Sequence, residues 1–283
     1  MTIKFPKLAL VALRLLLLAP LLGLSALAPK AHAESNTMFY TTGAGTDPAN
    51  GAELFAIQVS GSKITTQDVG PTHGGACATL ALSPSGTLYS MCGSLFGDQQ
   101  LATIDPKTGK ANLFGTAVPG LAVMALDFAS NGTVYAVGGC NPAKTTFECT
   151  LGSDPNYNSL YTVDVKTGAF TRVGATGARQ FFMDLAFDRN GKLYGVTTTL
   201  DPSQVPAILY SIDLATGKAT KIVNLVGSNS LMGLAFGPDG KLYATDYTQN
   251  PGLYLIDITT GFETAIAALP FGLSGSLELA NPQ

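Results

Sequence analysis

Three acidic side chains interrupt apolar segments of the sequence. Asp127 lies in MALDFA, Asp184 in FFMDLAF and Glu278 in SGSLELA. Carboxylates that come together can bind a cation, or act as acid and base in a hydrolysis. The alternative is structural, because buried carboxylates usually accept hydrogen bonds from backbone N–H groups or hydroxyls. The elements that position these residues decide which chemistry is open to them.

Asp127 and Asp184 lie in the first strand of a hairpin that occurs four times. Its pattern is an apolar strand, a turn containing Gly and a strand containing Tyr: LALSPSGTLYSM (80–91), LDFASNGTVYAV (126–137), LAFDRNGKLYGV (185–196) and LAFGPDGKLYAT (234–245). A second hairpin, with Asp and Thr-Gly around its turn, follows each: 101–114, 160–173, 209–222 and 253–266. Alternating polarity on both sides of each turn predicts strands.

The repeat predicts an all-β, five-bladed β-propeller of four-stranded antiparallel blades. The second hairpins start at 101, 160, 209 and 253, so one unit recurs every 44 to 59 residues, a period typical of propeller blades. Residues 37–45 and 53–69 match the last three strands of a unit, and 274–280 match its missing first strand. Pairing of the two ends in one blade would close a single domain over 34–283. A β-sandwich or open meander does not explain these complementary partial repeats.

Aligning the first strands of the blades on one Leu shows what should line the channel. The aligned residues are Leu80, Leu126, Leu185, Leu234 and Leu277. The residues before them are Thr79, Ala125, Asp184, Gly233 and Ser276, and those after them are Ala81, Asp127, Ala186, Ala235 and Glu278. Strict alternation puts all three acids on this face of small residues, and puts Met183 on the opposite face.

The loops predict which end of the propeller carries function. Turns within the hairpins are short and uniform, whereas the other connections vary greatly in length: 43–52, 93–100, 138–159, 197–207 and 246–252. Variable loops are where a scaffold carries binding or catalysis, although drift on an unselected surface is the alternative. His73 and Arg179 lie in blade-to-blade segments at this variable-loop face and could complete a polar rim. His73 is the one histidine after residue 33, so no histidine cluster could hold zinc.

The four cysteines predict disulfide bonds in an exported protein. Cys77 and Cys92 face each other in the register of adjacent strands, while Cys140 and Cys149 bracket one long loop. Of the three possible pairings, geometry therefore favours Cys77 with Cys92 and Cys140 with Cys149.

Residues 1–33 are predicted to be a cleaved signal peptide. Lys4 and Lys7 precede a Leu-rich run, and Ala31-His32-Ala33 supplies the small-x-small cleavage pattern. A membrane anchor is the alternative, because the run approaches the roughly 20 residues that span a bilayer.

We expect a secreted or periplasmic monomer. Its remaining 12 basic and 19 acidic side chains, with a net charge of −7 and no basic cluster, argue against nucleic acid or membrane as a partner.

The units LAF-x-x-x-G-x-LY and LY-x-ID-x-x-TG resemble the blades of bacterial secreted propellers of the YVTN and quinoprotein-like group. The resemblance implies the fold and little about activity, because the shared residues are hairpin residues. Gluconolactonase-like propellers, which bind a metal in the channel and open lactones, carry Asn or Asp two places before the aligned Leu. This chain has other residues there: Ala78, Met124, Met183, Met232 and Gly275.

Two functional hypotheses follow. No GxSxG elbow, Walker A loop or dinucleotide-binding motif is present, so we expect no cofactor. We favour an exported, non-enzymatic binding or interaction scaffold that uses the variable-loop face for a protein, a polymer or a small ligand. The alternative is a lactonase-like hydrolase or lyase, with or without a bound metal, that uses Asp127, Asp184 or Glu278 in the channel.

Overall fold

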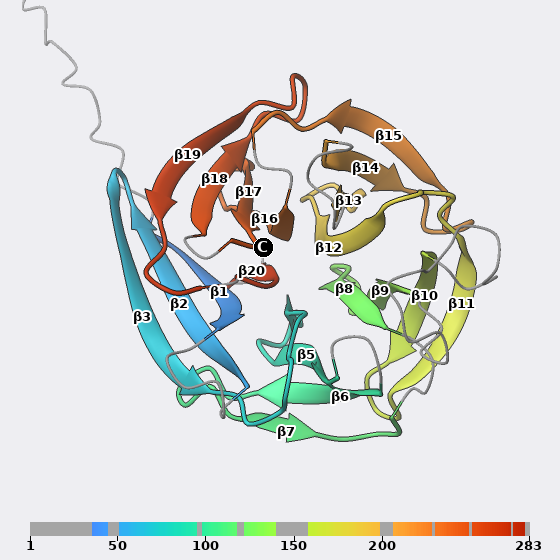
Figure 1. Cartoon of the computed structure of the whole chain (residues 1–283). Coiled ribbons are helices and arrows are strands. Elements are labelled where there is room, and N and C mark those ends of the chain that lie inside the picture. The colour runs from blue at the N-terminus through green and yellow to red at the C-terminus, as the bar shows by residue number, and fades with distance from the viewer. Residues whose placement is uncertain are drawn as a thin grey trace, which may run out of the picture. The chain divides into compact units, whose positions relative to one another are not determined.

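The computed structural model of the chain describes residues 36–44, 51–94, 98–117, 122–139, 158–198, 206–227, 230–248, 251–272 and 274–280. Its strands form five separate four-stranded antiparallel sheets. Between Asn36 and Ala280 these sheets stand in a ring as the blades of a propeller, with their first strands around a central channel (Figure 1). Within the described residues, no helix is long and apolar enough to cross a membrane.

Each blade runs from an inner strand at the channel to an outer strand at the rim. Blade A consists of β20 (Leu277–Leu279), β1 (Asn36–Ala44), β2 (Ala52–Ser60) and β3 (Lys63–Pro71). Blade B consists of β4 (Ala81–Leu82), β5 (Leu88–Gly93), β6 (Gln99–Ile104) and β7 (Ala111–Leu113). Blade C consists of β8 (Val123–Phe128), β9 (Val134–Gly138), β10 (Ser159–Asp164) and β11 (Ala169–Ala175). Blade D consists of β12 (Phe181–Phe187), β13 (Leu193–Thr198), β14 (Ile208–Ile212) and β15 (Ala219–Asn224). Blade E consists of β16 (Leu231–Phe236), β17 (Leu242–Asp246), β18 (Gly252–Ile256) and β19 (Glu263–Ala268).

Blade A joins strands from the two ends of the described chain. Strand β20 pairs antiparallel with β1, with Leu277 opposite Thr41 and Leu279 opposite Phe39. The predicted fold class and its closure are therefore confirmed. Closing the ring in this way lets every blade pack against two neighbours.

The apolar core is divided among the interfaces between neighbouring blades. The cluster between blades A and B contains Leu54, Leu80 and Leu88 together with a disulfide bond between Cys77 and Cys92. This disulfide confirms one predicted pair. The other pair, Cys140 with Cys149, and the signal peptide predicted over 1–33 lie outside the described residues.

The repeated Asp and Thr-Gly residues build turns that hold adjacent blades together. In blade D, the Asp213 carboxylate accepts hydrogen bonds from the Thr216 hydroxyl at 2.7 Å and the Thr216 N–H at 2.8 Å, which lower the pKa of Asp213. Gly217 follows at a φ of 76°, where a Cβ would lie 2.5 Å from the carbonyl oxygen of Gly174 in blade C. The second hairpin motif therefore serves turn geometry and blade contact.

Candidate functional site in the central channel

The channel is lined by strands that pair along only one edge. Strands β4, β8, β12, β16 and β20 each bond to the second strand of their blade, and the other edge of each faces the channel (Figure 1). Backbone N–H groups on that edge need acceptors wherever side chains exclude water. The three acidic residues singled out in the sequence supply such acceptors.

Asp184 is fully buried and joins three blades. Its carboxyl group accepts N–H bonds from Leu185 of its own strand at 3.0 Å, from Leu234 of blade E at 2.8 Å and from Leu277 of blade A at 3.1 Å. The Ser276 hydroxyl lies 2.9 Å from both carboxyl oxygens. Asp184 therefore accepts hydrogen bonds from the backbone of three successive inner strands. This is the structural role that the sequence analysis gave as the alternative for a buried carboxylate.

Asp127 and Glu278 repeat one arrangement two blades apart. Asp127 of blade C accepts N–H bonds from Phe128 of its own strand at 2.6 Å and from Phe187 of blade D at 2.7 Å. Glu278 of blade A accepts hydrogen bonds from the N–H groups of Leu279 in its own strand and of Leu82 in blade B. Each acid thus links its own inner strand to the next one around the ring.

Burial dominates the electrostatics of the three acids. It raises the pKa of Asp127 to about 7, although the N–H groups of Phe187 and Phe128 act in the opposite direction. Burial also raises the pKa of Asp184 well above the ordinary value, although the hydrogen bonds that Asp184 accepts act to lower it. Burial, followed by the negative charges of Asp127 and Asp184, raises the pKa of Glu278. Asp127 and Glu278 therefore compete for protons as a coupled pair.

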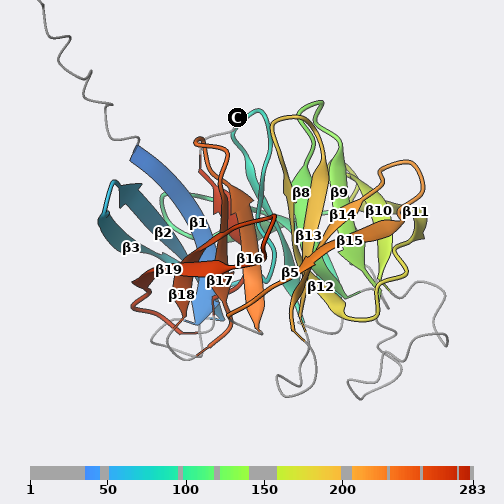
Figure 2. The same ribbon diagram turned by 90° about the horizontal axis from the view of Figure 1, so that it is seen from above.

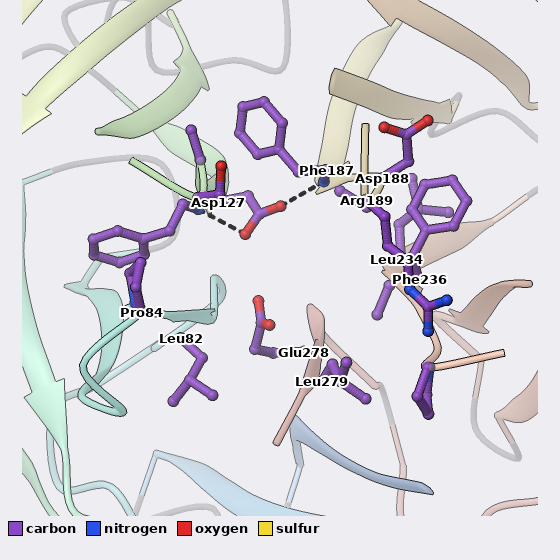
Figure 3. A pocket seen from close by; sticks show the side chains of 16 residues that line it. Leu82, Pro84, Asp127, Phe187, Asp188, Arg189, Leu234, Phe236, Glu278 and Leu279 are labelled. Carbon is purple, nitrogen blue, oxygen red and sulfur yellow. Dashed lines mark hydrogen bonds between the residues drawn. The ribbon is translucent and has the colours of Figure 1, made fainter. Parts of the chain in front are cut away.

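Asp127 and Glu278 line a cavity of about 590 Å³. Asp127 and Glu278 point toward one another in it (Figure 3). Its apolar lining includes Leu82, Phe128, Phe187, Phe236 and Leu279, and its rim includes Pro84, Ser130, Asp188, Arg189 and Pro238. Within the described part of the chain, no group of three or more His, Cys, Asp or Glu residues is placed to hold a metal ion.

The cavity opens at the end of the channel opposite to the variable-loop face. Its rim residues belong to the tight turns of the first hairpins, which gather at one end of the ring (Figure 2). Much of the variable-loop face, including 140–157 and 199–205, lies outside the described residues, so binding there stays a prediction. His73 and Arg179 are exposed residues in the segments that follow outer strands β3 and β11, and neither lines the cavity. The structure therefore brings together Asp127 and Glu278, with Asp184 deeper in the channel.

The sequence pointed to Asp127 and Glu278 as candidates, but it did not predict that they lie at the short-turn end of the channel. Four of the inner strands run toward a hairpin turn, and β20 runs in the same direction toward the end of the chain. A residue after the aligned Leu therefore lies nearer the short-turn end than a residue before it. Asp127 and Glu278 each follow the aligned Leu, whereas Asp184 precedes it. This order in the sequence was the available signal for a site near the uniform turns.

Three inner strands are irregular at a methionine, which strict alternation does not predict. Met124, Met183 and Met232 each occupy a position that the register with the second strand skips, which is the signature of a β-bulge. The three side chains pack against one another, with Phe181 beside them. Strict alternation fails at such a bulge, since the extra residue shifts the phase of the strand.

Comparisons with known proteins agree with this architecture. A family model described as a repeat of unknown function, DUF6923, matches residues 39–267. The chain belongs to the DUF6923 family. The match supports the interpretation of this DUF6923 protein as a propeller built from repeats, while its grouping with YVTN and quinoprotein-like propellers stays a prediction. No curated protein matches the sequence.

Solved structures similar to this DUF6923 protein are propellers of low sequence identity. TolB from Acinetobacter baumannii is 13% identical, with a TM-score of 0.51 over 88% of this chain and 67% of TolB. A gluconolactonase from Xanthomonas campestris is 13% identical, with a TM-score of 0.47 over 86% of this chain and 80% of the other. At this identity the likeness shows the fold alone.

Replacing Asp184 should destabilise the ring more than replacing its counterpart in blade B. Asp184→Ala leaves three backbone donors without their acceptor, so we expect the free energy of unfolding to fall by at least about 3 kcal/mol. Thr79 occupies the same strand position and accepts one N–H, from Met91 at 2.8 Å, so Thr79→Ala should cost about 1 kcal/mol. Urea denaturation of both variants measures the difference, and equal losses would contradict the bridging role.

The acid pair should make stability depend on pH. Because burial raises the pKa values of Asp127 and Glu278 in the folded chain, their contribution is fully present below the ordinary values of 3.8 and 4.5. The contribution of Asp127 is lost as pH rises through about 7, and that of Glu278 as pH rises through its own raised pKa. We expect the free energy of unfolding to fall between about pH 4 and pH 7, and Glu278→Gln to reduce that fall by about 1–3 kcal/mol.

Denaturation at both pH values checks this dependence. Asp68→Asn, which changes an exposed carboxylate on β3, is the control and should keep the dependence of the unchanged protein. If Glu278→Gln and Asp68→Asn behave alike, the coupled pair is not the cause.

Proposed function

We propose that the chain is an exported propeller that acts by binding, and that its ligand occupies the cavity at the short-turn end of the channel. The observation that carries this proposal is the cavity of about 590 Å³ with Asp127 and Glu278 pointing toward one another inside it. Its size and largely apolar lining with few convergent polar groups are typical of small-molecule sites. Export rests on the predicted signal peptide, with the Cys77–Cys92 disulfide as support.

The acid pair favours a small organic cation, such as a primary amine. Ionising both groups is unfavourable because they are buried and because each repels the other. A ligand cation between them removes the repulsion and supplies N–H donors to oxygens that face the cavity. An apolar portion of the same ligand would contact the Phe128 and Phe187 side of the cavity.

A panel of paired ligands tests this proposal. Each primary amine is matched with the alcohol of the same carbon skeleton, and binding is measured by isothermal titration calorimetry at about pH 6 and pH 8. We expect amines to bind more tightly than their alcohols. We also expect their affinity to rise with pH, because binding of the cation requires loss of the shared proton.

Glu278→Gln keeps the size of the side chain and removes its charge, so it should abolish the preference for amines. Asp68 lies outside the cavity, so the variant Asp68→Asn should keep the preference for amines. Equal binding of amines and alcohols, or an unchanged preference in Glu278→Gln, would contradict the proposed site.

A hydrolase that opens lactones or similar esters is the second candidate. The pKa of Asp127, raised to about 7, suits a general acid or base at neutral pH. Hydrolysis of a panel of small lactones, followed by the pH change of a weakly buffered solution, discriminates between the candidates. Turnover that disappears in Asp127→Asn would support the enzyme, whereas absence of turnover with retained amine binding supports the binding protein.

A further inference from the structure

Three of the six methionines in the chain meet in the channel, at the end away from the cavity. Met124, Met183 and Met232 come from β8, β12 and β16, which are the inner strands of three successive blades (Figure 1). They form a contact cluster of their own, distinct from the apolar clusters between the blades. Three thioether sulfurs are thus gathered in one place.

The backbone aims these side chains by one repeated device. In β8 the register passes from Val123 to Ala125, in β12 from Phe182 to Asp184 and in β16 from Leu231 to Gly233, so each methionine is the extra residue of a bulge. Bulges redirect a side chain and are common beside functional sites. The two remaining blades have Ala78 and Gly275 at this place, so only three blades contribute a methionine.

We propose that Met124, Met183 and Met232 form a binding site for a soft monovalent cation, Cu(I), through their three thioether sulfurs. Thioethers are soft, neutral donors that select Cu(I) over the hard cations held by carboxylates. Asp184 follows Met183 directly, but its oxygens already face three N–H groups and the Ser276 hydroxyl. The sulfur atoms are therefore the donors that define the site.

The surroundings suit a site of this kind. The three methionines are buried, at 4%, 4% and 7% exposed. Phe181 packs against them. The Cys77–Cys92 disulfide is typical of proteins outside the cytosol, where few free thiols compete with thioethers for Cu(I).

Titration with Ag(I), a redox-inert substitute for Cu(I), tests the proposal. The chain is used after any free thiols have been alkylated, in a chloride-free buffer, and Cu(I) binding is then confirmed by competition with bicinchoninate. We expect one ion per chain with an affinity that does not change with pH, because thioethers have no proton to lose. This insensitivity also separates the sulfur site from the acid pair, so failure of one proposal leaves the other intact.

Conservative variants identify the donors. The triple variant Met124→Leu, Met183→Leu, Met232→Leu nearly conserves side-chain volume and should lose binding while remaining folded. The double variant Met38→Leu, Met91→Leu changes methionines outside the cluster and should bind as the unchanged protein does. Thermal unfolding confirms that each variant folds, and each single Met→Leu change in the cluster is expected to weaken binding. No binding by the unchanged chain, or equal binding by the triple variant, would overturn the proposal.

Discussion

The structure depends on satisfying the channel-facing edges of five inner strands. A propeller closes its ring and so protects most strand edges, but each inner strand still turns N–H groups toward a narrow space from which side chains exclude much of the water. Asp184 meets this constraint for β12, β16 and β20, and Asp127 links β8 to β12. Glu278 links β20 to β4. The carboxyl groups are therefore part of the closure as well as candidates for function.

The channel divides into two ends of different chemistry. Its short-turn end holds two carboxyl groups beneath a cavity, and its other end holds three thioethers beside Phe181. Asp184 lies between them and is fully buried by its partners. The propeller needs a hydrogen-bond acceptor at only a few positions of the inner strands. The other residues of these strands can therefore differ among blades, and these differences give the two ends of the channel their different chemistry.

Most of the fold could be predicted from the sequence, because the information is local and repeated. Hairpin turns, alternation and the partial units at 37–69 and 274–280 define five blades and the pairing of β1 with β20. The register of one hairpin also predicts the Cys77–Cys92 bond.

The site was harder to predict, because it depends on contacts between blades. The donors of Asp184 come from residues 50 and 93 positions away. The orientation of Met183 depends on a bulge that strict alternation cannot reveal. The depth of each acid follows from strand direction, which places Asp127 and Glu278 toward the uniform turns. The variable loops favoured the opposite face of the propeller in the sequence analysis. Loops vary in length where change is tolerated as well as where they carry function, so this signal does not identify a site by itself.

The central claim is that the three acids are buried in the channel and that Asp127 and Glu278 form a coupled pair. Its most direct test is a titration of the side-chain carboxyl carbons by ¹³C NMR. A single series of spectra follows Asp127, Asp184 and Glu278 while the protein stays folded. We predict that Asp127 titrates with a pKa of about 7, and that the pKa values of Glu278 and Asp184 both lie well above the ordinary values for such groups because both carboxyl groups are buried. Ordinary titration of both Asp127 and Glu278 near 4 would contradict a coupled, buried pair in the channel.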